Sequence, residues 1–497
     1  MLLRALIAVL LAGAALAVGC SGEDSSGGAL ESTLAYVPQS TPFAVAIDTD
    51  VEGERFQALD DILARFPSLP DIQQLLQEEV EQGAGDVSYE EDVKPLLGNP
   101  FVFSAIDPDS LLGDSGEFVG VLQVEDTDAL DRVLEKAGAR EEGEVAGATI
   151  YEDEDGGAYG VEGDMMVLAT SRESLEASLE RADGDDHLDL ETFERGLEGL
   201  PKEALLRTYV DLQALIGQEP EGEQAQQVEW VGALRTLGIT ATAAEDAVEV
   251  EVNLRTEGED LTEEDLPLAA GDEPAQVVRI PGQVGLGLRD PSRLVSFFET
   301  AFQTLDPQGF GEYETAKRAI AQRYDIDIDE DVTGQLTGDL SVSLAADGGF
   351  GARAEVADPA AFTETVDRLA DALPQLGAGL GVTDVARRGN LYEARLADGG
   401  RFVFGVRDDV FVAGSGPGRA LAMASSQPED VSDASGSLVL SADAEEVALQ
   451  ILRQMAPNLG LGGIFGGGLF ARPLDELSGS VATSAAGMRG SFSLTLD

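Results

Sequence analysis

The stretch FAVAIDTDVEGERFQALDDIL, residues 43–63, decides how the rest of the chain is interpreted, because its pattern returns as VGLGLRDPSRLVSFFETAF at residues 284–302. Each stretch predicts a strand, then an acidic stop, then a helix. Four further pairs of segments correspond in the same order, namely 89–105 with 328–345, 120–138 with 352–370, 150–171 with 391–415, and 237–256 with 477–497. Five matched segments in one order predict an internal duplication.

Local patterns within these segments indicate the fold class. Asp290-Pro291 and Asp358-Pro359 each supply a helix N-cap followed by a first-turn proline. The helix after Pro291 is predicted to bury one apolar stripe, made of Leu294, Phe297, Phe298, Ala301, Phe302 and Leu305. Apolar and polar side chains alternate along residues 248–254, so one face of that sheet is predicted to be exposed to solvent. We expect an α+β fold with two internally duplicated halves, each a mostly antiparallel sheet with packed helices.

The N-terminus predicts a membrane anchor. One positive residue, Arg4, precedes an apolar run from Ala5 to Gly19, which is shorter than the about 20 residues that a membrane-spanning helix needs. The run therefore fits a signal peptide. It ends at Cys20, the only cysteine, and the residues around it resemble a bacterial lipobox, although the usual leucine three places earlier is Ala17 here. We expect Cys20 to be lipidated and to anchor the chain outside the cytoplasm, on the bacterial cell membrane.

Composition limits the partners. The chain of 497 residues carries 94 acidic and 31 Lys or Arg side chains, a formal charge of −63. A protein with this negative charge is repelled by the phosphate backbone of nucleic acids. We therefore expect no nucleic-acid partner. With 43% hydrophobic residues, the chain nevertheless has enough apolar material to form a packed core.

The opening YVPQSTPFAVAID, the DVKPLLG element and the duplicated halves resemble the uncharacterised bacterial membrane-anchored proteins grouped as domain of unknown function 3352. The second copy reads DVTGQLTG and lacks the proline. The resemblance implies no catalytic residues. We expect the chain to divide into a signal peptide at 1–19, the lipidated cysteine and a flexible tether at 20–32, a first repeat at 33–256, an acidic linker at 257–273 and a second repeat at 274–497.

No motif predicts a catalytic, metal or cofactor site. The single histidine, His187, lies in an acidic loop, which rules out His-pair metal motifs and Cys-His dyads. The GSGPG stretch at 414–418 lacks the lysine and the spacing of a phosphate-binding loop. Acidic runs that begin at Asp48 and at Asp325 resemble calcium loops, but the twelfth position is a leucine in both. We assign no catalytic residue, no metal and no cofactor, and expect a protein that is not an enzyme.

One segment is a candidate interaction site. Residues 457–473, PNLGLGGIFGGGLFARP, are apolar and glycine-rich, whereas the corresponding part of the first half is acidic and polar. We interpret this segment either as a flexible loop or as an apolar flap for a ligand or an envelope protein. The candidate residues are Leu459, Leu461, Ile464, Phe465, Leu469 and Phe470.

Three functions stay open at this point. The first is a lipid-anchored, non-catalytic binding or structural module of the cell envelope. The second is a solute-binding lipoprotein of a transporter, and the third is a carboxylate-dependent hydrolase, which the many acidic residues neither favour nor exclude.

Overall fold

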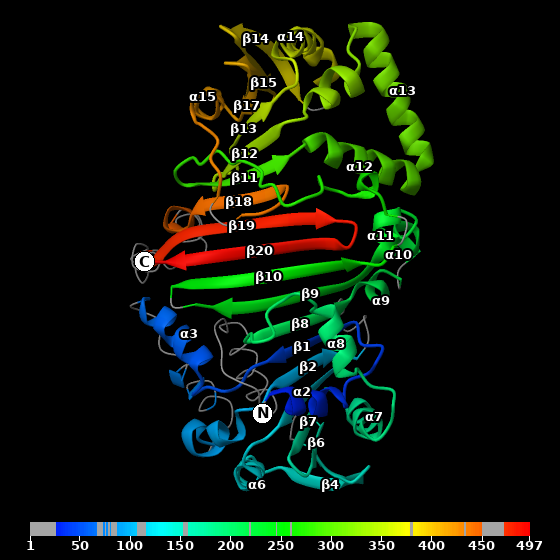
Figure 1. Cartoon of the computed structure of the whole chain (residues 1–497), viewed down its shortest axis with the longest axis vertical. Helices are drawn as coiled ribbons and strands as arrows, with labels where there is room; N and C mark the ends of the chain where they lie inside the picture. The colour runs from blue at the N-terminus through cyan, green and yellow to red at the C-terminus, as the bar shows by residue number, and fades with distance from the viewer. Residues whose placement is uncertain are drawn as a thin grey trace. The chain divides into compact units, whose positions relative to one another are not determined.

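The chain forms two compact units, each built from helices and an antiparallel sheet (Figure 1). Unit 1 comprises Met1–Glu223, Leu234–Thr256 and Leu496, and unit 2 comprises Gln224–Ala233, Glu257–Thr495 and Asp497. The computed structural model describes residues 26–66, 73, 74, 76, 77, 80, 87–106, 116–152, 158–217, 220–244, 246–258, 261–377, 381–431, 434–449 and 472–497.

The strands of unit 1 pair in the order β4-β5-β6-β7-β3-β2-β1-β8-β9-β10, and all these neighbours are antiparallel. The strands are β1 (Phe43–Ile47), β2 (Phe101–Ala105), β3 (Phe118–Gln123), β4 (Arg140–Val145), β5 (Ala148–Glu152), β6 (Ala158–Glu162), β7 (Met165–Ala169), β8 (Leu206–Asp211), β9 (Leu234–Ala243) and β10 (Ala247–Thr256). The helices are α2 (Ser26–Leu34), α3 (Glu54–Ala64), the π-helix η1 (Tyr89–Val93), the 3₁₀-helix η2 (Lys94–Leu96), α6 (Thr127–Lys136), α7 (Arg172–Ala182), α8 (Leu190–Gly196) and α9 (Leu212–Ile216), and α10 (Pro220–Ala225) follows.

The inner strands of unit 1 are covered on both faces. Val45 and Ile47 of β1 belong to one core, which α3 and α6 cover. Ala44 and Ala46, which point the other way, belong to a second core under α2, α7 and α8. The solvent-exposed face that the sequence predicts is present on β10, where Glu249 is exposed. For the centre of the sheet that prediction was wrong, because helices lie on both sides.

The strands of unit 2 pair in the order β14-β15-β16-β17-β13-β12-β11-β18-β19-β20, which matches the order in unit 1 strand for strand. The strands are β11 (Gln283–Arg289), β12 (Asp339–Ala345), β13 (Phe350–Glu355), β14 (Val382–Arg388), β15 (Leu391–Leu396), β16 (Arg401–Arg407), β17 (Val410–Gly414), β18 (Leu438–Asp443), β19 (Leu474–Ser484) and β20 (Gly487–Leu496). The helices are α11 (Glu229–Ala233), η3 (Glu263–Asp265), α12 (Pro291–Leu305), α13 (Pro307–Tyr324), the π-helix η4 (Ile328–Val332), η5 (Thr333–Gln335), α14 (Pro359–Leu376) and α15 (Pro417–Ser425).

A buried carboxylate ties the π-helix of unit 1 to the neighbouring helix. Asp92 of η1 is 1% exposed. Its Oδ2 accepts the backbone N–H of Ser88 at 2.8 Å and binds Nζ of Lys136, on α6, at 2.5 Å. Burial alone would raise the pKa of Asp92, but the hydrogen bonds from Lys136 and Ser88 and the charges of Lys136 and Arg132 outweigh it and hold that pKa below 3.8.

Unit 2 repeats this contact. Asp331 of η4 accepts the backbone N–H of Asp327 at 2.9 Å, and Arg368 of α14 lies 3.5 Å from the same carboxylate oxygen. Lys136 and Arg368 occupy the same place, because each lies ten residues after the Asp that caps its helix, Asp126 or Asp358. We call this arrangement of π-helix aspartate, backbone N–H and helix cation the aspartate clamp.

Part of the predicted tether was wrong. Residues 26–32 belong to helix α2 rather than to a flexible segment. Leu30 and Leu34, one helical turn apart, lie on the same side of α2 and are buried in the second core of unit 1. Two leucines at this spacing outweigh the glycines and serines around them, because burying them against the sheet stabilises the helix.

The prediction for α12 was correct in position but wrong in burial. The helix begins at Pro291, yet Asp290 has a left-handed backbone and makes no capping hydrogen bond. Phe298 is 62% exposed and Phe302 is also exposed, although both belong to the predicted buried stripe. The aromatic side chains of this stripe contact one another and α13, through pairs such as Phe302 with Phe310, instead of entering a core. Asp358, by contrast, caps α14 as predicted.

Lys317 connects three elements of unit 2. It lies on α13 and is 8% exposed, and its Nζ lies 3.1 Å from Glu299 of α12, 3.0 Å from Glu314 and 2.6 Å from Asp329 of η4. Burial alone would lower the pKa of this ammonium, but the hydrogen bonds to the three carboxylates outweigh it and raise that pKa above 10.5. The Lys317 contribution to stability is therefore fully present at neutral pH.

We expect Asp92→Asn to destabilise unit 1 by about 1–3 kcal/mol at neutral pH, because hydrogen bonds to a charged group are replaced by weaker ones. A lowered pKa means that the wild-type advantage is present above the unfolded-state value of 3.8 and is lost as the pH falls through the folded-state pKa. Hydrogen exchange of the α6 amides at several pH values measures this difference. Asp131→Asn, at an exposed position of the same helix, is the matched control, and equal protection in both variants would contradict the assignment.

We expect Lys317→Met to destabilise unit 2 by about 1–3 kcal/mol, because three carboxylates lose their shared cation. Trp230, the only tryptophan, packs edge-on against Phe297 of α12 and reports on this region in urea titrations followed by fluorescence. Arg318→Met, at the neighbouring exposed position, should leave the midpoint unchanged. An unchanged midpoint for Lys317→Met as well would show that the three contacts contribute nothing.

Candidate functional site

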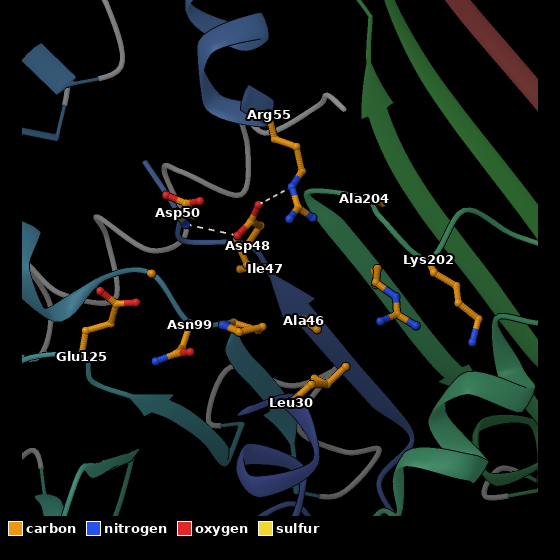
Figure 2. A pocket seen from close by; sticks show the side chains of 13 residues that line it. Leu30, Ala46, Ile47, Asp48, Asp50, Arg55, Asn99, Glu125, Lys202 and Ala204 are labelled. Atoms are coloured by element: carbon orange, nitrogen blue, oxygen red, sulfur yellow. Dashed lines mark hydrogen bonds and ion pairs between the residues drawn. The ribbon is translucent and has the colours of Figure 1, made fainter. Parts of the chain in front are cut away.

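The candidate site is a pocket at one edge of the unit 1 sheet (Figure 2). β1 and β3 end at this edge and β2 and β8 begin there, because the four neighbouring strands run antiparallel. The cavity has a volume of about 320 Å³, which is typical of sites for small molecules. Its lining consists of Leu30, Ala46, Ile47, Asp48, Asp50, Arg55, Gly98, Asn99, Pro100, Glu125, Lys202, Ala204 and Arg207.

Thr49 joins the two loops that border the pocket. Its hydroxyl donates to the Asn99 carbonyl at 2.6 Å and accepts the Gly98 N–H at 2.9 Å. The Asn99 side chain donates to the carbonyl of Gln123, at the end of β3, at 3.0 Å. Gly98 has a φ of 135°, and a side chain there would collide with the carboxylate of Glu125. The hydrogen bonds of Thr49 and Asn99 to backbone groups therefore hold the two loops in place, and none of them uses a charged side chain of the pocket.

Carboxylates gather on one side of the pocket. Asp48 follows β1 directly, and its Oδ2 lies 2.9 Å from Nε of Arg55 on α3. Burial raises the pKa of Asp48, and the Arg55 charge offsets that effect only in part. Figure 2 shows Asp50 and Glu125 on the side of the pocket away from Lys202. Within the part of the chain that the structure describes, no cation is paired with either of these two carboxylates.

Cations gather on the other side. Arg207 of β8 lies opposite Ala46 in the sheet, and its guanidinium carbon is 5.4 Å from the ring centre of Phe193. Its Nη2 lies 3.4 Å from Glu194, whose other carboxylate oxygen is 2.7 Å from Nζ of Lys202. Two cations thus share one carboxylate. Burial lowers the pKa of Arg207 despite the Glu194 charge, and among the described residues its buried Nε has no hydrogen-bond acceptor.

The corresponding place in unit 2 carries different chemistry. The N–H of Asp48 donates to the Leu205 carbonyl at 2.8 Å, and the N–H of Arg289 donates to the Ser437 carbonyl at 2.8 Å in the same position of its sheet. Two residues further along the strand pair, Val439 stands where unit 1 has Arg207. Val439 is fully buried in an apolar cluster. The shared sheet therefore forms without these charges, so the fold alone does not explain their presence in unit 1.

This arrangement suits a small ligand that carries both charges. A guanidinium and an ammonium that share a single carboxylate retain capacity for an anionic group. Asp50 and Glu125, across the pocket, can accept hydrogen bonds from a cationic group. The lining carries three cations and three carboxylates, so it is less acidic than the chain as a whole, whose formal net charge is −63.

Of the residues that the sequence analysis singled out, Asp48 and Asp50 of the first acidic run line this pocket. Cys20 and the flap residues Leu459, Leu461, Ile464, Phe465, Leu469 and Phe470 lie outside the described residues. His187 lies in a loop, and its Nδ1 is 3.0 Å from the Gly184 carbonyl. The two acidic runs serve other contacts, since Asp48 binds Arg55 and Asp331 belongs to the aspartate clamp. Within the described residues, no cluster of His, Cys, Asp or Glu side chains could hold a metal ion.

Sequence reasoning missed the cationic side of the pocket. The acidic run that begins at Asp48 resembles only an incomplete calcium loop, and no prediction from the sequence includes Lys202 or Arg207 as a site residue. A usable signal was present in Arg207, an arginine within the apolar strand of residues 206–211. A second signal was the aligned pair Asp48 and Arg289, where the two halves carry opposite charges at one position.

Comparisons with solved structures give only weak similarity. Crystal form III of a protein named TP0453 matches with 10% identity and a TM-score of 0.27, over 46% of this chain and 82% of that one. Crystal form IV gives 10% identity and a TM-score of 0.28, over 45% and 80%. Values this low do not establish a shared fold. No curated protein matches the chain, and none of the helices in its described part has the length and apolar character to cross a bilayer.

The sequence profile of one family covers most of the chain. The family is described as "Protein of unknown function (DUF3352)", and its match runs from residue 2 to residue 378. It includes the whole of unit 1 as far as Thr256, both π-helices and both aspartate clamps. The chain therefore belongs to the DUF3352 family.

Proposed function

We propose that this protein is a lipid-anchored, extracytoplasmic binding protein of the bacterial cell envelope, and that the pocket of unit 1 binds a small zwitterion such as an amino acid or a short peptide. The separation of charges across the pocket carries the proposal. Lys202 and Arg207 would bind the ligand carboxylate, and Asp50 and Glu125 would bind its ammonium. Ala46 and Pro100 would contact the apolar part between them.

The likeness of the two units supports a binding role for the first. We infer that the halves arose by duplication, since they share strand order and the aspartate clamp. After such a duplication each copy needs only its packing residues to fold. Charges kept at Asp48 and Arg207, where the second copy has Arg289 and Val439, are then best explained by a ligand.

The same pocket could serve a solute-binding lipoprotein of a transporter, which would deliver the zwitterion to a permease. A carboxylate-dependent hydrolase is a weaker candidate. Asp48, whose pKa is raised by burial, is engaged by Arg55 at 2.9 Å, and a general acid must be free to reach the substrate. The apolar flap at residues 459–470 stays a predicted site for an apolar ligand or an envelope protein.

We expect dialanine to bind the full chain in isothermal titration calorimetry. Two blocked analogues test each end of the ligand, since N-acetylalanine lacks the ammonium and alaninamide lacks the carboxylate. Each should bind at least tenfold more weakly, because one charge-assisted hydrogen bond contributes about 1.5–3 kcal/mol. If alaninamide bound as tightly as dialanine, the carboxylate site would be excluded.

The variants Lys202→Gln and Asp50→Asn should each weaken dialanine binding about tenfold while leaving the urea midpoint unchanged, because both side chains are at least partly exposed. Arg172→Gln removes an exposed arginine that pairs with Glu176 on α7 and serves as the matched control. Loss of affinity in the control as well would assign the effect to net charge rather than to the pocket.

We expect Cys20→Ser to release the protein from the membrane fraction of the cells that produce it. Two acyl chains hold a protein stably on a bilayer, whereas an unmodified N-terminus does not. Mass spectrometry of the mature N-terminus provides the direct measurement, and Ser21→Ala is the control, since it leaves the thiol in place. An unmodified Cys20 thiol in the membrane fraction would contradict lipid anchoring.

A further inference from the structure

A second pocket lies in unit 2, at a different place in the fold from the pocket of unit 1. It is bordered by the β14–β15 hairpin, by the turn after β16 and by the first turns of α15. Its volume is about 460 Å³. The charged side chains in its lining are Arg388, Glu393, Arg407 and Asp408, and its apolar side chains include Leu391, Val403 and Leu421.

Arginines surround the one buried carboxylate of this pocket. The Glu393 side chain is 8% exposed, and the guanidinium groups of Arg395, Arg401 and Arg388 lie 3.7, 3.9 and 4.0 Å from its oxygens. Three cations around one carboxylate leave a net charge of +2. Arg407 and Asp408, 3.4 Å apart, compensate each other. Because three guanidinium groups carry more charge than one carboxylate neutralises, Arg388, the one of the three that lines the pocket, retains capacity for an anion.

An apolar surface lies beside these cations. Leu421 of α15 is 40% exposed. Pro417 lies one turn before it on the same helix, and Leu391 and Val403 belong to the adjacent strands. A ligand that placed an anionic group on Arg388 could therefore lay an apolar chain over Leu421, and burial of each methylene would add to its affinity.

Unit 1 lacks this combination. In the sheet of unit 1, Gly143 of β4 stands opposite Ile150, where unit 2 has Arg388 opposite Leu391, and Glu152 stands where unit 2 has Glu393. Five residues after the cap of its helix, unit 1 has Glu176, which pairs with Arg172, whereas unit 2 has Leu421. Unit 1 therefore has a glycine where unit 2 has Arg388 and a glutamate where unit 2 has Leu421, so the shared fold does not require an arginine beside an apolar side chain.

We propose that this pocket binds an anionic amphiphile, with a phosphate or carboxylate head on Arg388 and an alkyl chain over Leu421. The proposal is independent of the zwitterion site, because the two pockets share no residue and each can be tested without the other.

The probe is hexyl phosphate, a short-chain amphiphile, titrated into the full chain by calorimetry. It should bind at least tenfold more tightly than inorganic phosphate, because the alkyl chain contributes, and tighter than hexyltrimethylammonium, because the site is cationic. Equal affinity for hexyltrimethylammonium would overturn the proposal, and so would equal affinity for inorganic phosphate. Binding to phosphatidylglycerol vesicles without binding to hexyl phosphate would also overturn it, since a membrane surface does not need the pocket.

Two variants test whether hexyl phosphate binds in this pocket. Arg388→Gln removes the anion partner, and Leu421→Glu introduces the residue type that unit 1 carries there, at an exposed position that the fold tolerates. Each should weaken hexyl phosphate binding at least tenfold, whereas Arg318→Gln on α13, an exposed arginine outside the pocket, should not change it. Wild-type affinity in Leu421→Glu, with an unchanged urea midpoint, would show that the amphiphile binds elsewhere.

Discussion

The aspartate clamp is the interaction on which the rest of each unit depends. A carboxylate inside a π-helix accepts a backbone N–H from the preceding turn and binds a cation on the neighbouring helix, Lys136 in unit 1 and Arg368 in unit 2. In unit 1, where Asp92 is buried, the charge is tolerated because it is paired in this way. The clamp holds the segment that leads into β2 or β12 against the helix that covers the sheet. In unit 1 the same segment continues into Gly98 and Asn99, so the clamp also positions one wall of the pocket.

The strand order that the two units share allows a comparison within a single chain. Whatever both units contain, such as the clamp, the helix cap at Asp126 or Asp358 and the order of pairing, is explained by folding. What only one unit contains needs another explanation. By this criterion the charges of Arg207 in unit 1 and Arg388 in unit 2 need such an explanation, because the other unit forms the same strand pairs with Val439 and Gly143 at those positions.

The two pockets share one electrostatic feature. In each, arginine or lysine side chains share a carboxylate, Glu194 in one case and Glu393 in the other. The shared carboxylate limits repulsion between the cations and keeps them in place, while donors remain for a ligand. Because screening is weak in partly buried sites, such pockets can attract anions that the acidic surface repels.

The sequence by itself determined the class of the fold, the order of strands and helices, and the correspondence of segments along the chain, because periodicity and turn residues are local properties. It also indicated the helix cap at Asp358. It could not determine the burial of Phe298, the helical state of residues 26–32 or the partners of Asp48, Asp331 and Lys317. Only the tertiary structure decided these, since burial and ion pairing depend on which distant segments meet. Both pockets belong to this second group, because their residues come from strands and loops that antiparallel pairing brings to one place.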